Sequence, residues 1–477
     1  TETKDMNRRR EALSGASDEP PKKIVRTTAI ELEIPKRKSV PCMVLACGQG
    51  DMGQLGLGED EMERKRPSIV GTFKNVVDIQ AGGMHSLLLT AEGKLFTFGC
   101  NDEGALGRDS SEEGSEFLPR EVTLPGKCVR ISAGDSHSAC LLEDGRVFAW
   151  GSFRDSHGSM GLTLEGSKRL PIEVLPGLKS CGIASGADHL VVLTCGGKVY
   201  TVGCGEQGQL GRVSLRTASG ESRRGKLQLL EPDVVHIKNT KFADAIWATT
   251  YCTFVRDMKT KKIFGFGLNN YNQLALKKIG EPMIAPSVTL LQNLKTVSGG
   301  QHHTLVLNED NVCSVIGRKD YGRLGLGKLE NDVEELRVIE SLKNKNIVDV
   351  SCGECQSFAI TAEGDVFAWG MGSNLQLGTG REDDEWEPVH IVSKQTKDSR
   401  IVQVSSGGQH TLFLARDKSN ENIESSEPTS GTQNLNGAKE FENDATTEVS
   451  EKQKSVEKEN AEISHTKTNA VKKGKKK

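Results

Sequence analysis

The sequence predicts an all-β fold, a seven-bladed β-propeller of repeats flanked by two disordered tails. The first observation behind this prediction is a unit of about fifty residues that recurs seven times. The second is the glycine content, 52 of 477 residues, which exceeds the roughly 7% of an average protein and indicates many tight turns. The third is that the apolar runs are short and separated by turn signals.

The repeated unit is marked by strand-like apolar runs that end in glycine. These glycines are Gly48, Gly99, Gly151, Gly203, Gly267, Gly317 and Gly370. Their intervals are 51, 52, 52, 64, 50 and 53 residues, so the fourth is longer than the others. A second loop of small residues ends in a histidine in five copies, at His85, His137, His189, His302 and His410. A fixed period of this size is typical of propeller blades.

Within one unit, short strands alternate with tight turns. In the second complete copy, residues 138–142 and 147–150 are strand-like, and Glu143-Asp144-Gly145-Arg146 lies between them. An Asp-Gly or Glu-Gly pair between apolar runs favours a hairpin, because the turn requires a positive φ. Four such strands form one blade.

The two ends of the repeat region predict how the ring closes. The first strand ends at Gly48, and the last strand begins at His410. We expect these strands to share one blade, because that arrangement leaves no exposed sheet edge. A linear solenoid is disfavoured, since neither end shows a polar capping repeat.

Composition divides the chain into three zones. We expect residues 1–40 to form a disordered basic tail, residues 41–416 the propeller, and residues 417–477 a disordered low-complexity tail with a basic end. Residues 1–40 hold ten Lys or Arg and seven Asp or Glu. Their basic clusters are typical of nuclear-import signals and of contacts with DNA phosphates, and the sequence does not separate these roles. The cluster residues are Lys22, Lys23, Lys36, Arg37 and Lys38.

Several classes of protein and site are disfavoured. No apolar run approaches the roughly 20 residues of a membrane-spanning helix, and no secretory signal is visible. The twelve cysteines are scattered, which favours free thiols in a reducing compartment. The glycine patterns at Gly48 and Gly203 recur with the blade period, so we expect no dinucleotide site. Cys352 and Cys355 lack a second ligand pair, so we expect neither a metal nor a cofactor.

Specific motifs then indicate a family. They are the segments at 48–56 (GQGDMGQLG), 98–109 (FGCNDEGALGRD), 151–155 (GSFRD), 205–212 (GEQGQLGR) and 298–303 (SGGQHH). This sequence resembles the regulator of chromosome condensation family, chromatin-bound guanine-nucleotide exchange factors for the small GTPase Ran. The resemblance covers residues 41–416 and the basic N-terminal tail. It implies a nuclear protein that serves nucleocytoplasmic transport and mitotic spindle assembly, and that catalyses exchange without covalent chemistry.

The resemblance also implies a Ran-binding face of the propeller. Carried over position by position, this face includes Asp51, His85, Asp135, Asp188, Arg212, His302 and His410. We expect Asp188 to be the main determinant of the exchange rate, with Asp135 and His302 next as docking residues. The three aspartates interrupt Gly or Gln positions of the repeat, which favours a functional role. The histidines have a structural alternative, since a residue that recurs once per blade usually holds its own loop.

A β-wedge that presses on the phosphate-binding loop of the GTPase is a further implication. The matching residues are Phe153, Arg154, Asp155, Ser156, His157, Gly158, Ser159 and Met160. Ser156-His157 stands where the family has a pair of asparagines.

The long fourth interval adds a basic segment to the propeller. Its cationic residues are Arg216, Arg223, Arg224 and Lys226. They are consistent with a solvated loop, or with a protruding loop that pairs bidentately with an acidic histone surface. We favour the second interpretation, with histones 2A and 2B of the nucleosome as the partner.

The expected partners are therefore Ran, nucleosomal histones, DNA phosphates and nuclear import receptors. We expect a monomer without a membrane partner. Two alternatives remain open. One is a non-catalytic chromatin or ubiquitin-pathway scaffold built on the same repeats. The other is a hydrolase or lyase propeller, which would need a nucleophile with an oriented base, or metal ligands, converging on the central channel.

Overall fold

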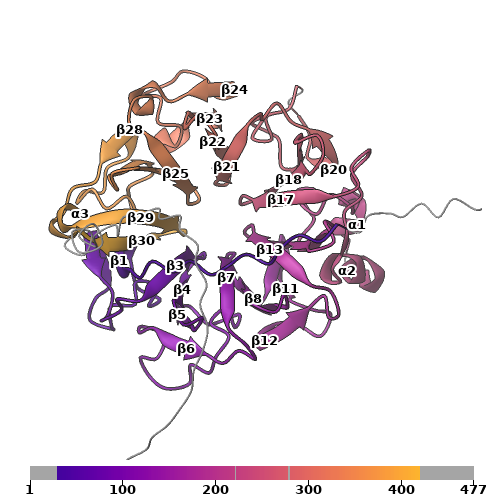
Figure 1. Ribbon diagram of the computed structural model, residues 1–477, viewed down its shortest axis with the longest axis horizontal. Coiled ribbons are helices and arrows are strands. Elements are labelled where there is room, and N and C mark those ends of the chain that lie inside the picture. Colours follow the sequence, from indigo (N-terminus) through magenta and orange to yellow (C-terminus); the bar gives the residue numbers. More distant parts are fainter. Residues whose placement is uncertain (1–29, 221, 278–279, 419–477) are drawn as a thin grey trace, which may run out of the picture. The chain divides into compact units, whose positions relative to one another are not determined.

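The computed structural model describes residues 30–220, 222–277 and 280–418, and these form a seven-bladed propeller (Figure 1). Each blade is a four-stranded antiparallel sheet. The predicted fold class is confirmed, and the tail after residue 418 lies outside the described residues.

Six blades each come from one continuous segment. From the innermost strand outward, the first blade consists of β3 (Val76–Ala81), β4 (His85–Thr90), β5 (Leu95–Gly99) and β6 (Arg120–Val122). The second blade consists of β7 (Cys128–Ala133), β8 (His137–Leu142), β9 (Val147–Gly151) and β12 (Lys168–Val174). The third blade consists of β13 (Ser180–Ser185), β14 (His189–Thr194), β15 (Val199–Gly203) and β16 (Asp233–Val234). The fourth blade consists of β17 (Ala243–Ala248), β18 (Cys252–Asp257), β19 (Ile263–Gly267) and β20 (Met283–Val288).

The fifth blade consists of β21 (Leu294–Gly299), β22 (His303–Asn308), β23 (Cys313–Gly317) and β24 (Val333–Val338). The sixth blade consists of β25 (Ile347–Cys352), β26 (Gln356–Thr361), β27 (Val366–Gly370) and β28 (Glu385–His390). Short elements decorate the ring: a hairpin of β10 (Phe153–Asp155) and β11 (Gly158–Gly161), helices α1 (Leu215–Ala218), α2 (Arg223–Leu230) and α3 (Lys394–Asp398), and single turns η1 (Asp320–Gly322) and η2 (Glu340–Leu342). No helix in the described ranges is long and apolar enough to cross a membrane.

The seventh blade contains both ends of the repeat region. Its strands are β29 (Ser399–Ser406), β30 (His410–Asp417), β1 (Met43–Gln49) and β2 (Glu63–Ile69). β1 pairs with β30 from Met43 opposite Ala415 to Gly48 opposite His410. The predicted shared blade is therefore confirmed, and the first strand of the ring is held in place by the last.

A Leu-Gly pair follows the third strand in several blades, as at Leu106-Gly107 and Leu324-Gly325, and its glycine has a packing role between blades. Gly107 has φ of 67°, and a Cβ added there would lie 2.7 Å from the indole Nε1 of Trp150 in the next blade. Trp150 is fully buried and donates this N–H to the carbonyl of Ala105 at 2.7 Å. Gly325 meets Trp369 in the same way. The glycine recurs because an aromatic ring of the following blade occupies the space of a side chain.

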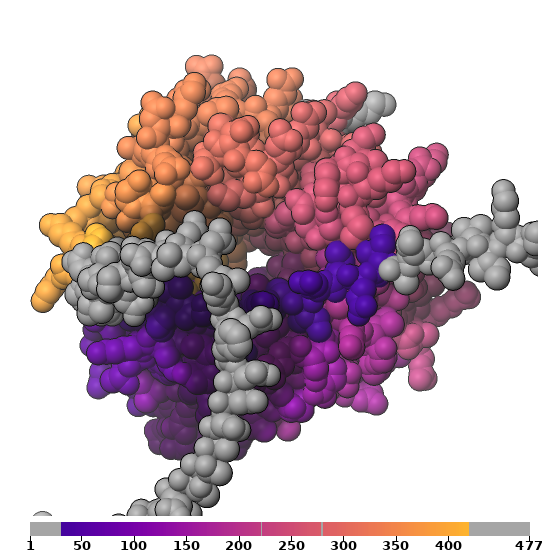
Figure 2. All heavy atoms as spheres, in the orientation of Figure 1, coloured from indigo at the N-terminus to yellow at the C-terminus, as the bar shows by residue number. Residues whose placement is uncertain are grey.

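Residues 30–40 form a strap, which corrects the boundary expected for the disordered tail. The strap lies along the face at which the innermost strands begin, beside the central opening (Figure 2). The backbone N–H of Leu32 donates to Cys195 O at 2.7 Å, and Arg37 donates to Ala91 O at 2.7 Å and to Cys128 O at 3.0 Å. Ile34 packs against the core, so the strap has apolar as well as polar anchors.

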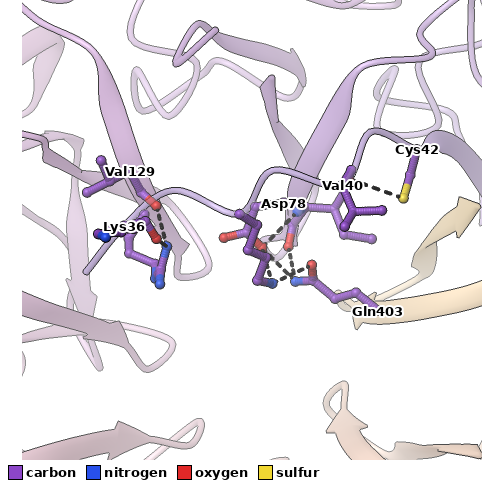
Figure 3. Close-up of polar contacts among 9 residues, drawn as sticks. Lys36, Val40, Cys42, Asp78, Val129 and Gln403 are labelled. Carbon is purple, nitrogen blue, oxygen red and sulfur yellow. Dashed lines mark hydrogen bonds and ion pairs between the residues drawn. The ribbon is translucent and has the colours of Figure 1, made fainter. Parts of the chain in front are cut away.

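The end of the strap reaches the seventh blade (Figure 3). The Nζ of Lys38 donates to Gln403 Oε1 at 3.2 Å and lies 3.5 Å from Asp78 Oδ1. Gln403 in turn donates to Asp78 at 2.8 Å. Arg37 and Lys38, two residues of the predicted import or DNA cluster, therefore bind the propeller in this structure. Lys22 and Lys23 lie outside the described residues.

We expect Arg37→Ala to lower the free energy of unfolding by about 1–3 kcal/mol, because hydrogen bonds from a charged donor to two carbonyls are removed. Lys36→Ala is the matched control, since the Lys36 side chain is exposed and only its carbonyl is used, by Arg130 at 2.9 Å. Urea unfolding measures both variants. Equal stabilities would show that the hydrogen bonds of Arg37 do not contribute to folding.

Candidate partner-docking face

The loops that follow the innermost strands meet on one face of the ring, which we call the wedge face. It carries Asp51, Asp188 and the β10–β11 hairpin. At its centre a cavity of about 280 Å³ is lined by the ends of the innermost strands. Beside it lies a funnel of about 610 Å³ whose walls include Asp135 and His302. The loops thus bring Asp51, Asp135, Asp188 and His302 to one face, and three of the four lie at its polar centre or beside the hairpin.

Three carboxyl groups of the wedge face have raised pKa values. Desolvation raises the pKa of Asp188 to about 6, and the backbone N–H of Arg154 opposes this by donating to the carboxylate. Desolvation, and then the charges of Asp188 and Glu354, raise the pKa of Asp135 above its usual range, although its side chain still reaches solvent. Desolvation also raises the pKa of Glu354. A cationic group of a partner would relieve this crowding of acids.

The predicted wedge residues form a hairpin separate from the blades. Residues 153–161 make a two-stranded sheet of β10 and β11. Phe153 is 1% exposed and anchors its base in the core, while Arg154 and His157 are exposed. The second strand is held by Glu103, whose Oε2 accepts from Ser159 Oγ at 2.9 Å. The hairpin therefore projects polar side chains from a rigid apolar base.

Two further carboxylates brace the first strand and the tip of the hairpin. Asp188 Oδ1 accepts from the Arg154 backbone N–H at 2.8 Å. Glu206 accepts from the backbone N–H of Ser156 at 3.0 Å and from its hydroxyl at 2.6 Å. Asp188 therefore positions the hairpin and adds negative charge beside it.

The hairpin tip also contains one group of potential metal ligands. Asp155, His157 and Glu206 offer ligand atoms within 4.8 Å of one another. Glu206 is already occupied by Ser156, and Asp155 accepts from the His157 backbone N–H at 2.8 Å. We therefore assign these residues to hairpin bracing.

His302 lies on the wedge face, but its place in the repeat differs from the expectation. His303, not His302, begins the second strand and pairs with Gly317, as His85 pairs with Gly99 in its own blade. His302 is thus the residue before the repeat histidine, the position that Asp188 occupies in its blade. Desolvation, with the nearby charges of Arg323 and Arg318, lowers the pKa of His302 to about 4. The adjacent histidines explain why the sequence pattern was misaligned by one residue.

His85 and His410 are buried, so we do not carry them into a docking surface. His85 is 1% exposed, and its Nε2 lies 2.8 Å from Ser138 Oγ in the next blade. His410 is 0% exposed and pairs with Ser86 Oγ at 2.8 Å. Because Ser138 and Ser86 each donate their own hydrogen to a backbone carbonyl, Nε2 of each imidazole is the donor. The structural alternative holds for these two residues, which link neighbouring blades.

Arg212 is likewise turned inward. Its guanidinium donates to Thr201 O at 2.8 Å, to Gln228 O at 2.7 Å and to Glu231 O at 3.1 Å. These bonds fasten the end of α2 to its blade, so Arg212 acts as a structural clamp. The sequence could not reveal this role, because the carbonyls of Gln228 and Glu231 belong to a later part of the long fourth interval, which folds back onto Arg212.

The basic segment of the fourth interval folds as two short helices instead of a loop. Ser214 and Ser222 cap the N-termini of α1 and α2, and their side chains accept from the backbone N–H groups of Thr217 and Gly225. α2 lies at the outer edge of the ring (Figure 1). The four cationic residues are exposed on these helices: Arg216, Arg223, Arg224 and Lys226.

Two residues of the funnel escaped the sequence analysis. Glu354 lies in the degenerate sixth copy of the small-residue loop, where the expected histidine is replaced. Arg323 precedes a Leu-Gly pair, at a position where most copies of the repeat have glutamine. Both residues differ from the usual residue at their position in the repeat. A search of every copy for such departures would have identified them.

Comparisons with known proteins agree with this architecture. A family model described as the RCC1-like domain matches residues 43–413. The regulator of chromosome condensation of Drosophila melanogaster is 55% identical over 415 residues, which cover 86% of this chain and 76% of the relative. The guanine nucleotide exchange factor SRM1 of Saccharomyces cerevisiae is 28% identical over 442 residues, covering 80% of this chain and 89% of the relative.

Two solved structures of the yeast protein Prp20 share the fold. One, studied with its binding properties to Gsp1p and histones, has a TM-score of 0.72 at 27% identity and covers 83% of this chain and 95% of the other. The other, yeast RCC1 (Prp20) bound to Kap60, has a TM-score of 0.74 at 26% identity and covers 89% and 98%.

Proposed function

The chain belongs to the family of regulators of chromosome condensation, and from that premise we propose that it is a nuclear, chromatin-associated guanine-nucleotide exchange factor for Ran. One relative, SRM1, is named a guanine nucleotide exchange factor, and the structure of yeast Prp20 was studied with its binding properties to Gsp1p and histones. The observation in this chain that carries the proposal is the braced hairpin beside a cluster of carboxylates on one face of a rigid ring.

Exchange needs no covalent step, because the factor and the nucleotide compete for the same GTPase. A factor that binds the nucleotide-free form more tightly shifts the equilibrium toward release. GTPases of this class hold phosphates with a glycine-rich loop, a lysine and Mg²⁺. We infer that Asp188, Asp135 and Asp51 offer carboxylates to this basic neighbourhood, while the β10–β11 hairpin displaces the loop. His302 docks at the funnel rim.

The direct test is release of a fluorescent GDP analogue from Ran. We expect substoichiometric amounts of the protein to accelerate release, since a catalyst turns over. No acceleration would refute the exchange function.

We assign chromatin binding to the α1–α2 segment and to the N-terminal tail. The four cations of the segment are exposed and spaced for charge-assisted pairing with an acidic histone surface. The charge of these cations is opposite to that of the wedge face. The acidic wedge face therefore suits the GTPase, and the basic α1–α2 segment suits the nucleosome. Residues before the strap add basic groups for DNA phosphates and for nuclear import receptors.

Deleting residues 1–29 is expected to weaken DNA binding and flatten its salt dependence, while exchange on free Ran stays intact. For every phosphate that the tail no longer neutralises, the slope of log K against log salt falls by about 0.9. The deletion stops before the strap, so the propeller keeps all its anchors. Identical slopes for both proteins would show that the tail neutralises no phosphates.

A further inference from the structure

The β10–β11 hairpin extends from the second blade but is held by carboxylates of the blades on either side. Glu103 lies in the loop after β5 of the first blade, and Glu206 lies in the corresponding loop after β15 of the third. Glu206 holds the tip of the hairpin through Ser156. The hairpin is therefore fixed from two sides, and its second strand depends on Glu103.

The carboxylate of Glu103 joins three segments around the hairpin. Its Oε2 accepts from Ser159 Oγ in β11 at 2.9 Å and from Ser167 Oγ, just before β12, at 3.1 Å. Its Oε1 lies 3.4 Å from Nη1 of Arg154 in β10. The Glu103 side chain is 23% exposed, so water screens these contacts less than it screens those of a fully exposed ion pair.

The bond to Ser159 continues into the buried base of the hairpin. Ser159 gives its one hydroxyl hydrogen to Glu103, so it is the acceptor in its 2.8 Å contact with Ser152 Oγ. Ser152 is 0% exposed, and its Oγ accepts from the backbone N–H of Gly161 at 3.0 Å. The contacts of Glu103 therefore reach the last residue of β11 as well as Ser159.

No packing role shared by the blades explains Glu103. The loops after the third strands of five other blades carry different residues at this position: Met52, Gln207, Tyr271, Tyr321 and Asn374. Within the part of the chain that the structure describes, a separate two-stranded hairpin follows the third strand of the second blade alone. The glutamate is thus matched to the hairpin and not to the repeat.

We propose that Glu103 is a positioning residue for nucleotide exchange, a role that rests on the proposed exchange function. By fixing β11, Glu103 keeps the hairpin where it meets the phosphate-binding loop of the docked GTPase. Glu103 acts through the hairpin and takes no part in docking, which belongs to Asp51, Asp135 and His302. The maximal rate of nucleotide release therefore depends on Glu103, and the KM for Ran does not.

The test uses the whole chain with two substitutions of Glu103 and one control. Glu103→Ala removes the acceptor of both hydroxyl groups, whereas Glu103→Gln keeps the length of the side chain and one oxygen with two lone pairs. Glu121→Ala is the matched control, because Glu121 is a glutamate of the same blade that pairs with Lys94 at 3.0 Å away from the hairpin. Release of a fluorescent GDP analogue at a series of Ran concentrations gives kcat and KM. Thermal unfolding verifies that each variant is folded.

We expect Glu103→Ala to lower kcat roughly tenfold and to change KM less than about twofold, because a misplaced group slows the reacting step without weakening contacts elsewhere. Glu103→Gln should retain at least about a third of the kcat, since its remaining oxygen can accept both hydroxyl hydrogens. Glu121→Ala should match the unsubstituted protein. In the absence of Ran, amide hydrogen–deuterium exchange of residues 153–161 should be faster in Glu103→Ala than in the other proteins.

The opposite results separate this role from the exchange function. An unsubstituted protein that releases no nucleotide refutes the exchange function, and the positioning role with it. If the unsubstituted protein is active and Glu103→Ala matches Glu121→Ala, only the positioning role is refuted. A raised KM at unchanged kcat also refutes it, because Glu103 would then dock the GTPase. Unchanged hydrogen–deuterium exchange of residues 153–161 in Glu103→Ala refutes it as well, because the hairpin would not depend on this carboxylate.

Discussion

Replacing Asp188 by alanine is expected to slow nucleotide release from Ran roughly 10- to 100-fold, the effect of losing about 1.5–3 kcal/mol of charged hydrogen bonding in the transition state. Two losses combine. The Arg154 N–H at the base of the hairpin loses its acceptor at 2.8 Å, and the wedge face loses a carboxylate. Nucleosome binding should not change, because the exposed cations of α1 and α2 are untouched.

Asp188→Asn separates the two losses. Asparagine can still accept from the Arg154 N–H but carries no charge. Because the pKa of Asp188 is raised to about 6, the carboxyl is ionised above that pH and neutral below it. Exchange by the unsubstituted protein should therefore fall more steeply between pH 7.5 and 5.5 than exchange by the asparagine variant, in which Asp135 still titrates but Asp188 no longer does. If the alanine variant is slow at every pH and the asparagine variant is fully active, Asp188 acts only by positioning the hairpin.

The matched variant for this experiment replaces Arg216, Arg223 and Arg224 by alanine. We expect weaker nucleosome binding in a gel-shift titration and nearly normal release of fluorescent GDP. If this variant loses exchange as severely as Asp188→Ala, the two functions share one surface and the division of labour is wrong.

The second large effect concerns ring closure. A protein lacking residues 1–60 should lose cooperative unfolding altogether, whereas one lacking residues 1–40 should keep it with reduced stability. The longer deletion removes β1, in which Val44, Leu45 and Cys47 are 0% exposed. Each such side chain contributes about 1.5–3 kcal/mol, so their sum approaches the whole stability of a domain. It also exposes the edge of β30 to other chains.

Differential scanning calorimetry compares the two deletions. The shorter one removes the strap but leaves β1 paired with β30. An unchanged melting profile for the protein lacking residues 1–60 would contradict the contribution of the shared blade.

The blades were predictable because their motifs serve interactions that repeat. Gly107 lies beside Trp150 and Gly325 beside Trp369, so the Leu-Gly pair recurs wherever an aromatic ring of the next blade needs room. Closure of the ring was predictable for a similar reason, because the strand that contains Gly48 does not come with a complete blade of its own. These inferences depend only on neighbours that the repeat itself supplies.

The functional residues were less predictable, because their surroundings come from outside the repeat. The strap shows no apolar periodicity, and Arg37 binds the carbonyls of Ala91 and Cys128, which the sequence does not mark. Arg212 turns inward because α2 folds back over its blade. His302 was assigned to the wrong repeat position because a second histidine follows it.

The pairing of β1 with β30 has a consequence for how the protein is made. A ribosome makes β1 about 360 residues before β30, so at about 5–20 residues per second the first strand waits roughly 20 to 70 s for its partner. During that time an apolar strand is available to other nascent chains. Prompt engagement by a chaperone would keep it competent, and a polysome that stalls before residue 410 would leave an open ring.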